Sequence, residues 1–269
     1  MYKAIFGILL LFIIFLAWDS IRETKMLKIE KLPIEIKDLP SSFQGLKIAQ
    51  ISDIHSQGFG EREKMVLEKL GQITPDFIVI TGDFVDWKTK NLDPCKEFWQ
   101  EIGQKYPGRV FGVFGNHEHH NPKFKTIKNY LKESGIKILE NETEKIIKNE
   151  DFIYLIGLDD PHEDLDDFNK ATKGIEDNHP KIVIAHSPEV FKKIKEKNID
   201  LVLTGHTHGG QINIPFVIEF FLPMKYDRKY KSGLFEEGEV KLYVNRGIGT
   251  TFLPVRFNAV PEITLVELK

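Results

Sequence analysis

The chain has 269 residues, of which 41% are hydrophobic and 29% charged, and this suits one large globular domain with appendages or two small domains. The formal net charge of −3 gives no bulk attraction to nucleic acid, so we expect no nucleic-acid partner. Cys95 is the only cysteine, which excludes an internal disulfide and a cysteine metal cluster, so a tightly bound metal must use His, Asp, Glu or Asn.

The N-terminus begins with an unbroken apolar run from Ala4 to Trp18. A bilayer span needs about 20 residues, so this run is short for one. A cleaved signal peptide would need a small-residue cleavage site, which LAWDS supplies poorly, and a buried helix that is apolar all round would be unusual at a terminus. We therefore expect residues 1–26 to be a single retained membrane anchor, followed by one domain over residues 27–269. Basic residues are more frequent after the run than before it, which favours the cytoplasmic side for that domain.

Downstream of the anchor, short apolar runs alternate with amphipathic segments. The apolar runs are typical of buried strands and lie at residues 46–52, 76–82, 109–115, 152–158, 181–187 and 200–206. Amphipathic periodicity predicts helices at residues 61–73, 95–105 and 123–133. After Gly209, the stretches QINI, KLYVNR and PEITLVEL indicate β-structure without intervening helices. The pattern predicts an α/β sandwich with a β-rich C-terminal third.

Five of the predicted strands end in polar residues and glycines. These groups are Asp53-Ile54-His55, Gly82-Asp83-Phe84-Val85-Asp86, Gly115-Asn116-His117-Glu118, His186, and Gly205-His206-Thr207-His208-Gly209-Gly210. Ligands of open α/β sheets bind beyond the carboxyl ends of the strands. Five polar termini at one edge of the sheets therefore predict a site there.

The spacing within these groups suits a metal ion. In an extended Asp-x-His or His-x-His segment, both side chains leave the same face of the chain and can reach one centre. Asp, Asn and His donors suit Mn, Fe, Zn or a similar divalent ion. The glycines permit sharp turns and the close approach of a phosphate to the backbone. Any one group alone is more often a simple turn, but five such groups in order at strand ends indicate a binding site.

In content and order, these groups resemble the signature of the calcineurin-like metallophosphoesterases. The resembling motifs run from Asp53 to His208, and Glu118 stands where the family more often has Asp. The segments 39–55, 205–215 and 245–268 are similar to the membrane-associated YkuE-like branch of that family. The resemblance implies an α/β fold, namely a four-layer α/β/β/α sandwich of two mixed sheets with an N-terminal membrane helix. It also implies that residues 27–269 are a metallophosphoesterase domain.

The resemblance further implies how the site is divided. It places a first metal ion at Asp53, His55, Asp83 and His208, and a second at Asp83, Asn116, His186 and His206, so that Asp83 bridges the pair. We expect two Mn ions, with Fe or Zn as alternatives, to lower the pKa of a bound water and to neutralise the phosphate oxygens. His117 would face the substrate, where it stabilises the transition state or protonates the leaving oxygen.

Other polar residues receive different interpretations. Asp86 is expected to orient a ligand rather than to bind metal. Arg246 follows a strand near a glycine turn, where contact with the substrate phosphate and a surface salt bridge fit it equally well. The remaining loop histidines are expected on the solvated surface, and they are His119, His120, His162 and His179.

Residues 214–224 form an apolar segment directly after the last metal motif, and the basic stretch 225–231 follows it. The segment is either part of the core or a membrane-dipping, acyl-binding element beside the metals. The second interpretation favours a membrane-anchored phosphodiesterase or pyrophosphatase with a lipid-linked substrate. Some members of the wider group hydrolyse UDP-2,3-diacylglucosamine. The alternatives are a soluble nucleotide or sugar phosphate as substrate, and a metal-binding scaffold without catalysis.

Overall fold

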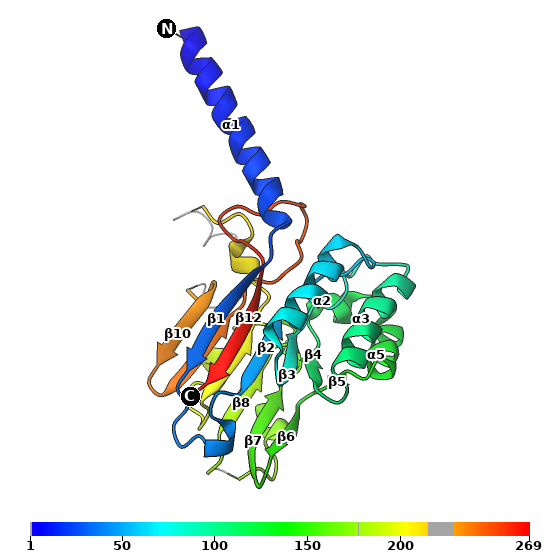
Figure 1. Cartoon of the computed structure of the whole chain (residues 1–269), viewed down its shortest axis with the longest axis vertical. Helices are drawn as coiled ribbons and strands as arrows, with labels where there is room; N and C mark the ends of the chain where they lie inside the picture. Colours follow the sequence, from blue (N-terminus) through cyan, green and yellow to red (C-terminus); the bar gives the residue numbers. More distant parts are fainter. Residues whose placement is uncertain (1, 177, 215–228) are drawn as a thin grey trace.

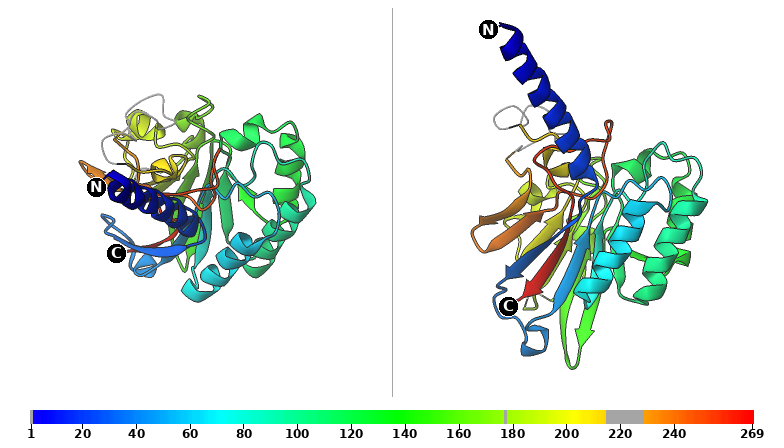
Figure 2. Two further views of the ribbon diagram at one scale, coloured as in Figure 1. Left: turned by 90° about the horizontal axis from the view of Figure 1, so that it is seen from above. Right: turned by 45° about the horizontal axis from the view of Figure 1, so that its top comes forward.

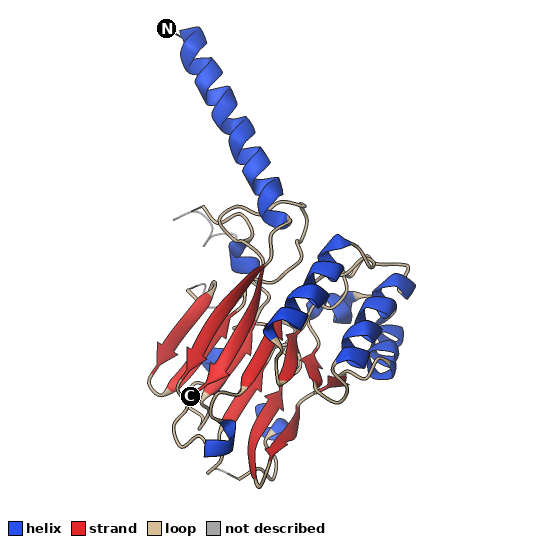
Figure 3. Cartoon of the chain, in the orientation of Figure 1, coloured by secondary structure: helices blue, strands red, loops and turns tan. Residues whose placement is uncertain are grey.

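The computed structural model describes residues 2–176, 178–214 and 229–269. Two six-stranded sheets lie between helices, and one long helix projects from an edge of the sandwich (Figures 1 and 3). The described helices are α1 (Tyr2–Thr24), α2 (Glu61–Ile73), α3 (Asp93–Lys105), α4 (Asn116–His120), α5 (Phe124–Glu133), α6 (Phe168–Ala171) and α7 (Val190–Ile194), with short 3-10 turns η1 (Ser41–Phe43) and η2 (His208–Gly210).

The first sheet has the strand order β1-β12-β2-β3-β4-β5. Its strands are β1 (Lys28–Ile34), β12 (Glu262–Leu268), β2 (Lys47–Ile51), β3 (Phe77–Thr81), β4 (Val110–Val113) and β5 (Lys137–Ile138). The strands from β2 to β5 are parallel to their neighbours, whereas β12 is antiparallel to β2. The last strand of the chain therefore lies inside the sheet, between β1 and β2.

The second sheet has the strand order β10-β11-β9-β8-β7-β6. Its strands are β10 (Gly233–Glu237), β11 (Val240–Val244), β9 (Leu201–Thr204), β8 (Lys181–Ile184), β7 (Asp151–Gly157) and β6 (Glu142–Lys148). The four central strands β11, β9, β8 and β7 are parallel, and the outer strands β10 and β6 pair with them in antiparallel fashion. Both sheets are mixed, as predicted.

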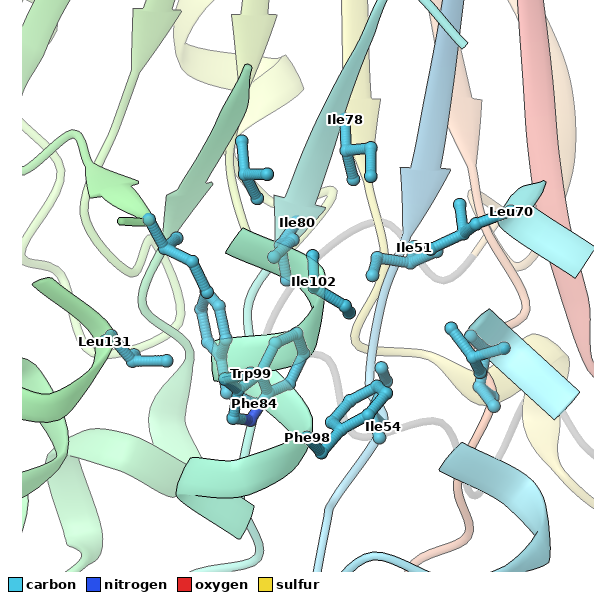
Figure 4. Close-up of a cluster of buried hydrophobic side chains, with 14 of the residues drawn as sticks. Ile51, Ile54, Leu70, Ile78, Ile80, Phe84, Phe98, Trp99, Ile102 and Leu131 are labelled. Atoms are coloured by element: carbon cyan, nitrogen blue, oxygen red, sulfur yellow. The ribbon is translucent and has the colours of Figure 1, made fainter. Parts of the chain in front are cut away.

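Side chains along the central strands point alternately to the two faces of the sheet, so one set packs between the sheets and the other packs against the helices. In β3, Phe77 and Val79 face the second sheet, while Ile78 and Ile80 face the helices. Both faces are covered, which explains why such strands read as continuous apolar runs. Figure 4 shows the helix-facing cluster, where Trp99 of α3 packs on Phe84 with ring centroids 4.9 Å apart. A third apolar cluster packs α7 against the outer face of the second sheet. The four-layer α/β/β/α sandwich predicted from the sequence is confirmed.

Most predicted elements occur where the pattern places them. Helix α2 has the predicted bounds, and the six predicted strands correspond to β2, β3, β4, β7, β8 and β9. The stretch QINI was wrongly predicted as a strand, since only Ile212 makes an isolated bridge, to Phe257. Short edge strands such as β6 and β10 were not predicted, because their polar, half-exposed sequences carry little apolar signal.

Helix α1 is longer than the apolar run that predicted it. Its window from Ile5 to Thr24 has a mean hydropathy of 2.1 and is not buried by the rest of the chain. Twenty helical residues rise about 30 Å, which equals the hydrocarbon thickness of a bilayer. The helix is thus long and apolar enough to cross a membrane. It leaves the sandwich at the edge where the parallel strands β2, β3 and β4 end (Figures 1 and 2).

Candidate metal centre

The proposed metal ligands sit in turns that begin directly after buried strands. Several of them adopt the left-handed backbone region, which non-glycine residues rarely enter. The φ angles are 50° for Asp53, 48° for His55, 52° for Asp83, 69° for His206 and 52° for His208. Such strain persists only where the surrounding structure holds it, and it concentrates at functional sites. The strand ends thus hold these side chains in orientations that a relaxed turn would not adopt.

The first donor cluster gathers around His55. Its Nε2 lies 3.0 Å from Nε2 of His208 and 3.5 Å from Oδ2 of Asp83. Nε2 of His208 lies 3.4 Å from Oδ1 of Asp53. All four side chains are buried. The ligand atoms of Asp53, His55 and His208 are close enough together to hold one metal ion.

The second donor cluster gathers around His186. Its Nε2 lies 3.3 Å from Oδ2 of Asp83, 3.1 Å from Oδ1 of Asn116 and 3.0 Å from Nδ1 of His206. Oδ2 of Asp83 therefore faces both clusters, because the same atom approaches His55 in the first. The structure brings all seven predicted ligands together, and their roles in metal binding are part of the proposal below.

The protonation pattern suits a cation at this position. Nδ1 of His186 lies 2.9 Å from the carbonyl oxygen of Thr81, which can only accept, so a neutral His186 directs the lone pair of Nε2 into the cluster. Burial lowers the pKa of His55 well below its ordinary value, which favours the neutral ring that a metal needs. Burial opposes the charge on Asp83, but His186 and other nearby rings outweigh it and hold the pKa of Asp83 well below its ordinary value. Burial opposes the charge on His186, but Asp83 outweighs it and holds the pKa of His186 well above its ordinary value in the metal-free chain, so a bound cation would take the place of that proton. Once His186 is neutral, the carboxylate and the imidazoles form a donor set that fits a divalent ion.

Glu118 links the turn after β3 to the turn after β4. Its carboxylate accepts hydrogen bonds of 3.0 Å from the backbone N–H groups of Asp83, Val85 and Gly115. The bond to Gly115 closes a capping box at the start of α4, and the other two fix the turn after β3. Gly115 itself must be glycine, since a Cβ there would overlap Oδ1 of Asp83. Glu118 therefore positions Asp83 without touching the donor atoms.

His117 lies at the rim of the first cluster. Its Nδ1 accepts from the backbone N–H of Trp87 at 3.3 Å and lies 3.1 Å from Nδ1 of His55. Because a backbone N–H only donates, neutral His117 carries its proton on Nε2. The ligand atoms of His55, Asp83 and His117 could also hold a metal, so the geometry alone permits a ligand role for His117 as well. Asp86 lies beside this ring, with Oδ2 3.9 Å from Nδ1.

The guanidinium of Arg246 is engaged by two carboxylates and a backbone carbonyl. It pairs closely with Glu262, lies 3.4 Å from Glu30, and donates to the carbonyl of Val260. These contacts are the salt bridge that the sequence left open for this residue. Its contact with a substrate phosphate stays a prediction.

Arg256 lies in no motif of the sequence, yet it is fully buried beside the first donor cluster. Its guanidinium donates to the carbonyls of Gly249, Arg246, Ala259 and His208, and also contacts Nδ1 of His208 at 3.1 Å. A guanidinium only donates, so Nδ1 of His208 accepts here, and metal binding at Nε2 of His208 requires this contact to change. A basic residue in a turn-rich stretch gives no sequence signal for this role.

Three histidines were wrongly predicted as solvated, namely His119, His162 and His179, and the last of these stacks on Phe152 with ring centroids 3.8 Å apart. His162 packs against His206 with ring centroids 4.7 Å apart, and its Nδ1 lies 3.0 Å from Oε2 of Glu189. His119 pairs with Asp159 at 2.8 Å and packs against Phe124. His119 lies in α4 and His162 in the loop after β7, and tertiary contacts that no local pattern encodes cover much of both rings.

A two-sheet α/β sandwich with an Asp, Asn and His cluster at the carboxyl ends of its strands defines a metal-dependent phosphoesterase. The chain belongs to the calcineurin-like phosphoesterase family, whose model matches residues 46–210. It is 32% identical to the uncharacterized metallophosphoesterase YkuE of Bacillus subtilis, over 92% of this chain and 87% of the relative. It is 33% identical to the phosphodiesterase YaeI of Escherichia coli, over 72% of this chain and 70% of the relative. A transmembrane protein with metallophosphoesterase domain of Danio rerio is 32% identical, over 90% of this chain and 57% of that protein.

Proposed function

We propose that this metal-dependent hydrolase is a membrane-anchored, two-metal phosphodiesterase or pyrophosphatase with a lipid-linked substrate. The position of Asp83 is the observation that supports two metal ions. Its Oδ2 lies 3.5 Å from Nε2 of His55 and 3.3 Å from Nε2 of His186. The carboxylate of Asp83 thus lies between the two donor clusters, where it could be shared by two ions. Two divalent ions, proposed to be Mn with Fe or Zn as alternatives, would supply Lewis acidity and an activated water near neutral pH.

Each side chain of the site has a proposed role in metal binding or catalysis. Asp53, His55 and His208 would hold the first ion, Asn116, His186 and His206 the second, and Asp83 both. His117 would present its Nε2–H to the leaving oxygen as a hydrogen-bond donor that stabilises the transition state, since its other nitrogen is engaged by the N–H of Trp87. To protonate that oxygen, His117 would first have to bind a second proton at Nδ1 in place of this contact. Arg246 is retained as a candidate phosphate contact at the outer edge. The presence of every expected ligand together with His117 favours a catalytic site over a metal-binding scaffold.

Two features favour an amphipathic substrate. The first is α1, which would place the domain at a bilayer, and we propose the cytoplasmic face from the charge after the apolar run. The second is an apolar cavity of about 280 Å³ between the end of α1 and the start of α2, lined by Met26, Leu27, Met65 and Ile248 among others. Arg62, also in its lining, donates to the carbonyl of His55. An acyl chain in this cavity would therefore end close to the first donor cluster.

UDP-2,3-diacylglucosamine is the substrate that we propose to test first, and a soluble nucleotide or sugar phosphate is the alternative. The apolar segment 214–224, which also favoured a lipid, lies outside the described residues except for Ile214. Each buried CH₂ group contributes about 0.8 kcal/mol, so even a few methylenes in the cavity would separate the acylated from the deacylated substrate.

The test is a substrate panel with the purified full-length chain in detergent and Mn²⁺. It compares UDP-diacylglucosamine, its deacylated form, a generic phosphodiester and a phosphomonoester by kcat/KM. We expect hydrolysis to stop on chelation, to return with metal, and to favour the acylated pyrophosphate. Equal kcat/KM for the acylated and deacylated forms would reject the lipid substrate in favour of the soluble one. Full turnover in protein shown by elemental analysis to be metal-free would reject the proposed chemistry, and metal binding without turnover of any substrate would favour the scaffold.

A further inference from the structure

Residues 249–256 form a loop, here called the tip loop, that exposes two large apolar side chains. The side chain of Phe252 is 97% exposed and that of Leu253 is 57% exposed. Phe252 also has a φ of 52°, in the left-handed region that a bulky residue rarely enters. A strained backbone that presents an aromatic ring to solvent is an outlier that calls for a partner.

Specific contacts hold the tip loop in place. The side chain of Gln211 donates to the carbonyls of Thr251 and Leu253 at 2.8 and 2.9 Å, and it accepts from the backbone N–H of Thr251 at 2.8 Å. The carbonyl of Gln211 accepts from the N–H of Phe257. Gln211 follows the His206-x-His208 motif by three residues. The tip loop is therefore fixed to the segment that carries two of the proposed metal ligands.

The same loop touches both the metal centre and α1. At one end, the N–H of Gly249 donates to the carbonyl of Asp53 at 2.6 Å. At the other end, the N–H of Arg256 donates to the carbonyl of Ser20 at 3.0 Å, and the N–H of Ala259 donates to Oε2 of Glu23 at 3.2 Å. Figures 1 and 2 show this loop at the base of α1. The exposed ring of Phe252 thus belongs to a loop that is hydrogen-bonded to α1 at one end and to the metal centre at the other.

The point at which the tip loop contacts α1 indicates how deep the loop would lie in a bilayer that α1 crosses. Ser20 precedes Thr24 by four residues, so its carbonyl lies about 6 Å further along the helix axis, toward the middle of the apolar window. Arg256 contacts the helix at that level. Exposed basic residues, Arg22 and Lys25, flank the same end of α1, where they would meet anionic headgroups. Aromatic rings are favoured at this interfacial depth of a bilayer.

We propose that the tip loop is a second membrane contact, in which Phe252 and Leu253 enter the interfacial region of the bilayer that α1 crosses. The loop holds the metal centre toward the bilayer surface, so that a lipid-borne phosphate reaches it without leaving the membrane. A lipid surface is the partner because the loop is hydrogen-bonded to the last turns of α1, the helix that would cross the bilayer. This inference rests on the membrane anchor of the proposed function.

The test measures the depth of single labels in the full-length protein reconstituted into phosphatidylcholine and phosphatidylglycerol liposomes. A Phe252→Cys variant and a matched Ile147→Cys control are labelled with the fluorophore NBD. Ile147 is 70% exposed and lies in β6 near the turn into β7, at the end of the sheet away from α1 (Figure 1). Native Cys95 is buried. Wild type treated with the same NBD reagent measures the residual reactivity of this cysteine.

We expect NBD at position 252 to be quenched at least twofold by lipids that carry a shallow doxyl group and to be shielded from aqueous iodide. NBD at position 147 should show the opposite pattern. Equal lipid quenching at the two positions would overturn the inference. Shielding from iodide without lipid quenching would also overturn it, because a protein surface rather than lipid would then cover the loop.

Flotation separates this inference from the proposed function. A chain that does not float with liposomes after a high-salt wash refutes the anchor itself, whereas a floating chain with a water-exposed label at 252 refutes only the loop contact. A Phe252→Ser, Leu253→Ser double variant gives a second readout that does not depend on labelling. It should hydrolyse a water-soluble phosphodiester at the wild-type rate but a phosphodiester embedded in vesicles at least threefold more slowly, and equal slowing of both substrates would contradict the inference.

Discussion

Replacing Glu118 with Gln changes one atom of a buried carboxylate and nothing in its size. Oε2 accepts from the N–H groups of Asp83 and Gly115, and Oε1 accepts from the N–H of Val85, each at 3.0 Å. A glutamine can keep two of these bonds through its single oxygen. Its NH₂ group then faces the N–H of Val85, so one buried donor loses its partner.

The expected effect depends on whether the metals are present. Burial, with the charge of Asp83, raises the pKa of Glu118 to about 8 in the metal-free chain. This folded-state pKa exceeds the unfolded value of about 4.3, so the contribution of Glu118 to stability is full below that value and declines as the pH rises toward 8. Glutamine does not ionise, so near pH 8 the metal-free Glu118→Gln variant should be at least as stable as wild type.

Adding metal should reverse that order, because two nearby cations favour the ionised carboxylate. The variant then lacks one hydrogen bond to a charged group, a loss of about 1.5–3 kcal/mol. For a domain of this size, such a loss lowers Tm by roughly 3–12 °C. The assay is thermal unfolding of the full-length protein in detergent at pH 8, with Mn²⁺ and with EDTA. The control is Glu133→Gln, which removes an exposed ion pair with Lys96 and should change Tm little in either condition. An equal loss of Tm with and without metal would refute the charge argument, and no loss with metal would refute the positioning role.

Three further predictions concern the site and the cavity. Asp83→Ala or Asn116→Ala should release more metal than His117→Ala, which should retain metal but lose about 10²–10⁴-fold in kcat, as measured by elemental analysis and turnover. If His117→Ala empties the site, that residue is a ligand. Gly115→Ala should weaken metal affinity by about 10–100-fold, because the added Cβ displaces Asp83, and metal titration measures this effect. Met65→Trp should fill the apolar cavity and lower kcat/KM for an acylated substrate only, and an equal loss for the deacylated form would contradict an acyl site.

The parts of the molecule that could be predicted from the sequence are those where local pattern and tertiary role coincide. Strand β3 is buried on both faces, so its five residues are apolar apart from Thr81, and Asp83 follows directly at the open edge. Asp53 and Asp83 converge because the parallel strands β2 and β3 end at one edge of the first sheet, and His186 joins them from the end of β8 in the second sheet. The sequence thus predicts which residues meet, and their order along the chain.

Contacts between distant segments could not be predicted in this way. The pairing of β1 with β12 joins residues more than two hundred positions apart, and neither strand determines the partner of the other. The burial of His162 against His206 and the tautomer of His117 likewise depend on backbone groups that arrive from other loops. Periodicity reports which face of an element is covered but not what covers it.

The C-terminal segment completes the site, although the family model ends at residue 210. Strand β12 separates β1 from β2, so its removal would open the first sheet beside the strand that leads to Asp53. Residues 246–259 add the N–H of Gly249 behind Asp53 and the guanidinium of Arg256 behind His208. The side chain of Arg256 thus contacts a proposed ligand, while its backbone N–H contacts α1 at Ser20. We therefore expect a displacement of the helix end to move the groups behind the first donor cluster, because Arg256 contacts both α1 and His208.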